Sequence, residues 1–207
     1  TWVRDDDASG LAALSQAVVE NAVEVVGHAV DGDAAAGLRA ATRIKVLAAT
    51  RRGPLGLVEW SKRIEDGVVR RVPKLKRGGR WYVGRPVIVT ANDQLTKVSN
   101  GDVGLVVRNG ESTAVAFAEG DDVRRVPTSR LDNVDTWWAM TIHKSQGSEF
   151  EHAVVSLPAQ GSPILTRELL YTAVTRAKQR VTVVGSEAAI REAVERPVAR
   201  ASGLSER

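Results

Sequence analysis

The chain has 207 residues, 43% of them hydrophobic, which suffices for one good core and a small second one. It has no cysteine, which excludes disulfides and cysteine-ligated zinc or iron–sulfur sites and fits a reducing compartment. No apolar run approaches the roughly 20 residues of a membrane span. The acidic start, T-W-V-R-D-D-D, is unlike a signal peptide. We therefore expect a soluble, cytoplasmic protein without membrane contact.

The net charge is +4, and the basic residues cluster at 51–52, 70–80 and 124–130. Clustered Lys and Arg side chains can neutralise phosphates and release counterions from a nucleic acid. A solvated basic surface is the plainer alternative, and composition favours it at least equally. The three histidines are far apart and show no metal-ligand spacing, so we predict no metal site on this chain.

The first third of the chain predicts mainly helices. Apolar residues at helical spacing predict an amphipathic helix over 8–30, capped by Asp7 or Ser9 and ended by Gly27. A shorter helix, a covered strand, a third helix and a basic linker follow over 34–42, 44–49, 57–65 and 68–79.

The middle of the chain predicts short strands at regular spacing, over 86–91, 103–107, 113–118 and 123–126. Asn100-Gly101 and Asn109-Gly110 separate the first three, and Asn-Gly is a strong hairpin signal. We expect a small barrel or sheet that is inserted into another domain.

After Leu131 strands and helices alternate. Strands are predicted over 136–140, 153–157 and 181–184, and helices over 166–177 and 187–195, the last capped by Ser186. Alternation predicts a parallel sheet covered on both faces, hence one α/β domain with a β-insertion. Trp137 and Trp138 should point to opposite faces, one into the core and one towards the insertion.

Polar groups follow the predicted strands, and parallel sheets bind ligands beyond the carboxyl ends of their strands. Arg51 follows strand 44–49, residues 141–146 follow strand 136–140, and Arg176 lies on the helix after strand 153–157. Two arginines that converge there would suit a triphosphate. The alternative is that Arg51 caps the preceding segment and Arg176 is a solvated helix residue, which periodicity alone favours.

The run from His143 to Gly147 has side chains suited to phosphates. Lys, Ser and Thr can bind phosphates of a strand, and Gln146 can orient a water or a phosphate. Gly147 permits close backbone approach or ends a short helix. Glu149 can accept hydrogen bonds from a ribose. No carboxylate is placed to make His143 a base.

Four segments in series resemble motifs of superfamily-1 DNA helicases. Residues 47–56 are similar to motif IV, 137–150 to motif V and 167–180 to motif VI, while 81–93 with 100–104 resembles the start of an inserted SH3-like domain. Their order and spacing resemble the carboxyl-terminal part of the RecD family, the alpha subunits of bacterial RecBCD exonuclease V, from about Lys45 to Gly185.

This resemblance implies a fold and a division of the chain. The fold is α/β, a RecA-like (P-loop NTPase-type) parallel sheet called domain 2A, with an inserted small SH3-like β-barrel called 2B. The implied parts are a helical segment of 2A over 1–43, 2A over 44–83, 2B over 84–133, 2A again over 134–196, and a tail over 197–207.

The resemblance also implies ATP- and Mg²⁺-dependent 5′-to-3′ translocation on DNA during double-strand-break repair and recombination. Arg51 and Arg176 would be the catalytic contacts to the γ-phosphate. The nucleotide side of motif V would be lined by Gln146, Gly147 and Glu149. DNA would be touched or positioned by Thr141, His143, Lys144 and Ser145.

The chain has no G-x-x-x-x-G-K-[ST] phosphate loop. We therefore expect the phosphate loop and the Mg²⁺ ligands on a missing N-terminal RecA-like motor domain, and no activity from this fragment alone. The other expected partners are single-stranded and duplex-end DNA and RecB-like and RecC-like subunits. Alternatives are the helicase half of a conjugative relaxase and a non-catalytic RecA-like scaffold module, although a scaffold need not keep Arg51 and Arg176.

Overall fold

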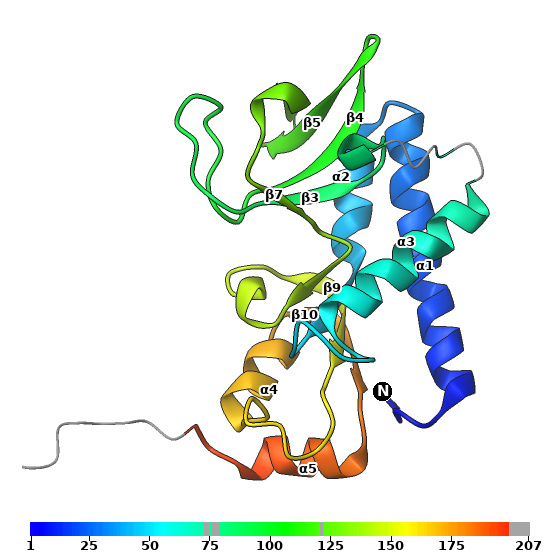
Figure 1. Ribbon diagram of the computed structural model, residues 1–207, viewed down its shortest axis with the longest axis vertical. Coiled ribbons are helices and arrows are strands. Elements are labelled where there is room, and N and C mark those ends of the chain that lie inside the picture. Colours follow the sequence, from blue (N-terminus) through cyan, green and yellow to red (C-terminus); the bar gives the residue numbers. More distant parts are fainter. Residues whose placement is uncertain (73–74, 76–78, 121, 199–207) are drawn as a thin grey trace, which may run out of the picture.

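The computed structural model describes residues 1–72, 75, 79–120 and 122–198 of the chain (Figure 1). Within these residues the strands form two five-stranded sheets, which lie one above the other in Figure 1. The lower sheet is parallel and the upper one is antiparallel. The predicted α/β class with a parallel sheet is confirmed.

The first sheet has the strand order β1-β10-β9-β2-β8. Its strands are β1 (Trp2–Val3), β2 (Ile44–Ala48), β8 (Ala139–Thr141), β9 (Phe150–Ser156) and β10 (Ala177–Val184). The central strands β2 and β9 are buried along most of their length. Burial on both faces explains why both strands have an uninterrupted apolar stretch, over 46–48 in β2 and 153–155 in β9.

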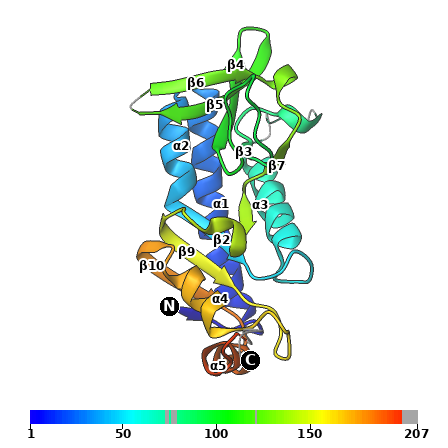
Figure 2. The ribbon, with the colours of Figure 1, turned by 90° about the vertical axis from the view of Figure 1, so that its left-hand side faces the viewer.

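Helices cover both faces of the first sheet. Figure 2 shows α4 in front of the sheet and α1 behind it. The helices are α1 (Ala8–Val30), α2 (Ala34–Arg43), α3 (Leu57–Arg71), α4 (Arg167–Val174) and α5 (Glu187–Glu195). Helices α1 and α2 are long enough to pack on the second sheet as well, so one large core includes residues of both sheets.

Local capping sets the helix starts that the sequence predicts. Asp7 accepts a hydrogen bond from Gly10 N, and Ser186 accepts one from Ala189 N. The predicted end of the first helix at Gly27 is wrong, because α1 continues to Val30. Its buried stripe runs on to Ala29, and this packing outweighs the cost of about 1 kcal/mol of a glycine inside a helix.

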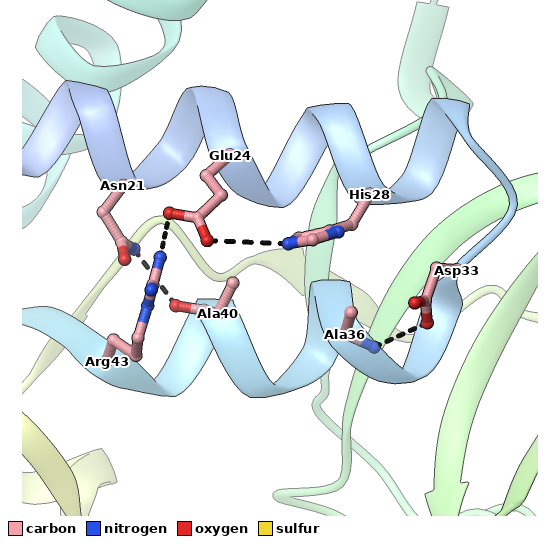
Figure 3. A network of polar contacts seen from close by, with 7 residues as sticks. All are labelled: Asn21, Glu24, His28, Asp33, Ala36, Ala40 and Arg43. Atoms are coloured by element: carbon pink, nitrogen blue, oxygen red, sulfur yellow. Dashed lines mark hydrogen bonds and ion pairs between the residues drawn. The ribbon is translucent and has the colours of Figure 1, made fainter.

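Polar contacts join α1 to α2 along their exposed seam (Figure 3). Glu24 on α1 pairs with Arg43 and with His28, one turn further along α1. Asn21 donates to the carbonyl oxygen of Ala40, at 3.1 Å. These contacts hold α2 against α1 just before the chain enters β2.

The second sheet is an antiparallel sheet with the order β6-β5-β4-β3-β7. Its strands are β3 (Pro86–Val89), β4 (Val103–Asn109), β5 (Ser112–Glu119), β6 (Asp122–Pro127) and β7 (Val134–Thr136). One of its faces holds a separate small core that includes Val87, Val106 and Phe117. The other face packs on α1 and α2.

The two Asn-Gly pairs have different roles. Asn109-Gly110 forms the tight hairpin between β4 and β5, where Asn109 pairs with Ser112 and Gly110 has a φ of 62°. Asn100-Gly101 instead ends a longer connection from β3 to β4, in which Asp93 pairs with Val98. The hairpin prediction is therefore right for the second pair and wrong for the first.

The predicted single strand over 136–140 is wrong, because the chain changes sheets there. Thr136 ends β7 in the second sheet and Ala139 begins β8 in the first. Trp137 and Trp138 cross between the sheets, and both are buried. The run looks like one strand because every residue from 137 to 140 is apolar and buried, although only Ala139 and Met140 belong to a strand, β8.

The predicted linker over 68–79 begins too early. Helix α3 continues to Arg71, and Gly67 and Val68 are buried in it. A Cβ at Gly67 would lie 2.5 Å from Val19 of α1, so the glycine permits close packing of the two helices. Residues 73–74 and 76–78 of the predicted linker lie outside the described residues.

Candidate functional site

Residues of the predicted site gather at the carboxyl edge of the first sheet. β2 and β8 are parallel neighbours, with Ala48 opposite Thr141. Arg51 follows β2 and lines the same hollow of about 340 Å³ as Thr141 and Lys144. The prediction that Arg51 and Thr141 lie at one edge of the sheet is confirmed. Arg51 is exposed, and within the described residues its guanidinium has no hydrogen bond or ion pair.

Arg176 lies at the opposite, amino edge. It directly precedes β10, whose first residue, Ala177, pairs with Phe150 at the start of β9. Its carbonyl oxygen accepts a hydrogen bond from Phe150 N at 2.8 Å. Figure 2 shows the loop after β2 and the start of β10 on opposite sides of the sheet.

The prediction that Arg51 and Arg176 converge at one edge is therefore wrong. The seven residues of β9 separate the edges by about 20 Å, at about 3.3 Å per residue. The helix that leads to Arg176 ends at Val174, and the strand after it begins at Ala177. Because α4 returns from the carboxyl edge to the amino edge, a residue just beyond it lies at the far end.

The Arg176 side chain is held by three hydrogen bonds. Its Nε donates to Thr172 O at 3.1 Å, one terminal nitrogen donates to Ser148 O at 3.4 Å, and the other donates to Thr175 Oγ1 at 3.2 Å. An arginine has five N–H donors, so both terminal nitrogens keep donor capacity for an anion. Nearby, Glu149 is exposed and pairs with Lys178 at 3.3 Å.

The segment 142–149 connects the two edges. Its first turn, His143–Ser145, is a short 3-10 helix, in which Lys144 N donates to Thr141 Oγ1 at 3.3 Å. Ser145 is fully buried and its hydroxyl donates to Ile142 O, so its side chain holds the turn and is out of reach of a ligand at the surface. Gly147 has a φ of 84°, a conformation that favours glycine, and it ends this turn as predicted.

His143 and Gln146 are exposed and line a second hollow of about 850 Å³, whose wall includes Thr172 on α4. Since the Thr172 carbonyl holds Arg176, this hollow adjoins the arginine. The predicted nucleotide-side residues Gln146, Gly147 and Glu149 are therefore spread along the path from the hollow to the amino edge.

Several charged residues near the site have no signal in the sequence. Asp135 lies 3.4 Å from the Lys144 Nζ, on the strand β7 that the sequence did not predict. Lys45 is fully buried and its Nζ donates to Trp137 O at 2.8 Å, while burial lowers the pKa of this amine well below its usual value. The sequence does not show that this lysine is buried, because its burial depends on which strands lie on either side of β2.

A set of polar contacts lies where the chain enters the second sheet before β3 and leaves it after β7. Trp138 Nε1 donates to the Tyr82 hydroxyl, which donates to Glu65 Oε1 at 2.6 Å. Burial and then the Glu65 hydrogen bond raise the pKa of Tyr82. Arg85 donates twice to Thr136 Oγ1, and burial lowers its pKa. The orientation of β7, and hence of Asp135, follows from these contacts.

Mg²⁺ binds mainly to carboxylate oxygens and water. In the described part of the chain no three His, Cys, Asp or Glu side chains converge on a possible ion position. This part of the chain therefore offers no ready Mg²⁺ site.

None of the helices among the described residues has the length and apolar character needed to traverse a bilayer.

Comparison with known proteins agrees with the motifs. Residues 136–184 match the family of UvrD-like helicase C-terminal domains. The chain is 42% identical over 206 residues to the RecBCD enzyme subunit RecD of Mycolicibacterium smegmatis, covering 100% of this chain and 36% of that protein. The resemblance to the carboxyl-terminal part of RecD is confirmed. Together with the parallel sheet, the family match supports an α/β RecA-like helicase domain.

Two further matches are weaker. The ATP-dependent RecD2 DNA helicase of Deinococcus radiodurans is 31% identical over 152 residues, which are 70% of this chain and 20% of that protein. A Bacteroides Pif1 helicase, solved with ADP-AlF3 and single-stranded DNA, has a TM-score of 0.44 at 15% identity, covering 89% of this chain and 51% of that one. The chain spans about a third of the length of the RecD protein of Mycolicibacterium smegmatis.

Proposed function

We propose that the chain is the second motor domain of a RecD-like, ATP-dependent 5′-to-3′ DNA helicase subunit. It would act with RecB-like and RecC-like subunits in double-strand-break repair and recombination. The observation that carries this proposal is the segment 141–150, which joins two polar edges of one sheet. Similarity to RecD over the whole chain supports it.

At the amino edge, Arg176 would contact the γ-phosphate of ATP bound on a partner RecA-like domain. When bound, ATP with Mg²⁺ supplies the phosphoryl group whose hydrolysis drives the motor. The guanidinium is already oriented by three hydrogen bonds, so little reorganisation accompanies phosphate contact. Gln146, Gly147 and Glu149 would line the approach. An arginine in this role contributes about 10³ to 10⁵ in turnover.

At the carboxyl edge, Arg51, Thr141 and Lys144 would bind phosphates of single-stranded DNA, with His143 beside them. The sequence predicts that Arg51 contacts the nucleotide, whereas we propose that it contacts DNA. It shares a hollow with Thr141 and lies a strand's length from Arg176. Cations without fixed partners suit a backbone that has to slide past them. Ser145 would hold the turn that presents Lys144.

The segment 142–149 would couple the two edges. Arg176 is bonded to Ser148 at one end of it, and Thr141 is bonded to Lys144 at the other. A shift of Arg176 on phosphate binding would reach the DNA contacts through a short, turn-locked segment. The second sheet, proposed as an SH3-like 2B module over residues 84–133, would guide the strand beside the carboxyl edge.

The test is Arg176→Ala in the full-length protein, with Arg180→Ala as the matched control on the exposed part of β10. We expect DNA-stimulated ATP hydrolysis to fall about a thousandfold or more in the first variant. The control should hydrolyse ATP normally, and both should bind a single-stranded oligonucleotide as the wild type does. Near-normal hydrolysis by a folded Arg176→Ala protein would refute the motor role.

A further inference from the structure

Two charged residues in the hollow at the carboxyl edge have no role so far. This hollow is where α3, β7, β8 and the loop after β2 meet. Its walls include apolar residues of α3, β3 and β8. Its polar lining includes Arg51, Ser61, Lys62, Asp135, Thr141 and Lys144. Lys62 and Asp135 belong to none of the helicase-like motifs, and they face the hollow from elements on either side of it.

Lys62 reaches the hollow from α3. The residues of α3 that line the hollow are 57, 58, 61, 62 and 65, which is the spacing of one helix face. The opposite face, with Trp60 and Ile64, is buried in the core and fixes the rotation of the helix. Lys62 is therefore directed at the hollow by the packing of its own helix.

Lys62 also lacks a counterion. It is exposed, and the described part of the chain provides it with no hydrogen bond or ion pair. Glu65, an acid of the same helix face that also lines the hollow, accepts a hydrogen bond from the Tyr82 hydroxyl. Together with Arg51, which is equally unpaired, Lys62 leaves an excess of positive charge around a small hollow. Such a site suits a phosphodiester.

Asp135 has the opposite effect. It lies on β7 of the second sheet, and its carboxylate is 3.4 Å from the Lys144 Nζ, with both side chains about half exposed. Exposed pairs of this kind are weak, because water and salt screen them. A phosphate can therefore replace the carboxylate at Lys144, and the carboxylate repels that phosphate as long as it stays in the hollow.

We propose that Lys62 is a further phosphate contact of the single-stranded DNA site, and that Asp135 competes with the DNA for Lys144. Asp135 holds Lys144 in place when no DNA is bound, and it weakens the binding of DNA when DNA is present. This competition keeps affinity low enough for the strand to be released between steps. The inference rests on the proposed DNA site at the carboxyl edge and adds the two residues that set its strength.

The experiment measures equilibrium binding of a fluorescent oligo(dT) to the full-length protein at several salt concentrations without ATP. Lys62→Gln should bind several-fold more weakly, and the slope of log K against log salt should shrink by about 0.7, one phosphate contact. Asp135→Asn should bind several-fold more tightly. Matched controls remove the same charges outside the hollow: Lys178→Gln at the amino edge, and Asp132→Asn three residues before Asp135.

A double variant tests whether Asp135 acts through Lys144. If it does, Asp135→Asn should tighten binding in the wild type and have little effect in a Lys144→Gln background. An equal gain in both backgrounds would overturn the competition. All exposed-residue variants should keep the wild-type melting temperature, which excludes misfolding as the cause.

Two failures can be told apart. If the wild type shows no salt-dependent oligonucleotide binding, or Lys144→Gln binds like the wild type, the proposed DNA site itself fails. If Lys144→Gln weakens binding but Lys62→Gln and Asp135→Asn behave like their controls, the DNA site stands and only the added roles are overturned.

Discussion

The cationic side chains at the carboxyl and amino edges of the first sheet differ in how many polar contacts hold them. At the carboxyl edge Arg51 and Lys62 are unpaired within the described residues, and Lys144 has one exposed partner. At the amino edge Arg176 is tied by three hydrogen bonds to backbone carbonyls and a hydroxyl. Loose cations suit a ligand that moves, whereas a fixed guanidinium suits one defined transition-state geometry. The same sheet thus has an adaptable end and a rigid end.

The largest expected effect comes from replacing each arginine by lysine. Arg176→Lys keeps the charge but loses the fork that its three hydrogen bonds orient, so ATP turnover at saturating DNA should fall about a thousandfold. Arg51→Lys should change turnover little, since its edge needs charge and not a fixed geometry. Steady-state ATPase assays of both variants check this. An equal loss of ATP turnover in both variants would contradict the proposed difference between the two edges.

A buried lysine amine between the edges gives the next effect. Burial lowers the pKa of Lys45 in the folded state, so the folded protein binds fewer protons than the unfolded one. Stability therefore rises with pH between the folded pKa and the unfolded value of about 10.4, by up to about 1.4 kcal/mol per pH unit. Urea unfolding of the wild type against Lys45→Met, from neutral to alkaline pH, measures this slope.

The connection between the edges can be strained at one glycine. A Cβ at Gly147 meets nothing within 4 Å, so Gly147→Ala costs only the left-handed backbone, about 1–2 kcal/mol. Gly27→Ala, equally free of contacts but inside α1, should instead stabilise by about 0.5–1 kcal/mol. Denaturant unfolding of both variants measures these two changes in the free energy of unfolding. If Gly147→Ala also weakens the stimulation of ATPase by DNA, this segment couples the edges.

The smallest effect concerns the exposed ion pairs, one at each edge. Asp135→Asn and Glu149→Gln remove the partners of Lys144 and Lys178. Each should change the free energy of unfolding by less than about 1 kcal/mol, because exposed pairs are screened. Thermal unfolding at low and high salt measures this. A large loss from either variant would mean that its pair is structural, and the picture of a loosely held cation would fail for that edge.

Local features were predictable because local forces set them. The starts of α1 and α5 depend on Asp7 and Ser186, whose side chains cap their own helices. The β4–β5 hairpin depends on Asn109-Gly110, which adopts the backbone conformation that the turn needs. The end of α1 was not predictable from Gly27, since burial further along the helix decided it.

The sequence alone determined the α/β class, the antiparallel insertion and the residues of the helicase-like motifs. These features depend on apolar spacing, turn residues and motif order, which are local properties of the sequence. Only the tertiary structure decided which edge each cation occupies. Arg176 lies opposite Arg51 because α4 carries the chain back along β9, and Asp135 meets Lys144 because the chain changes sheets at Trp137 and Trp138. Such proximity depends on the direction of whole elements, which no local pattern encodes.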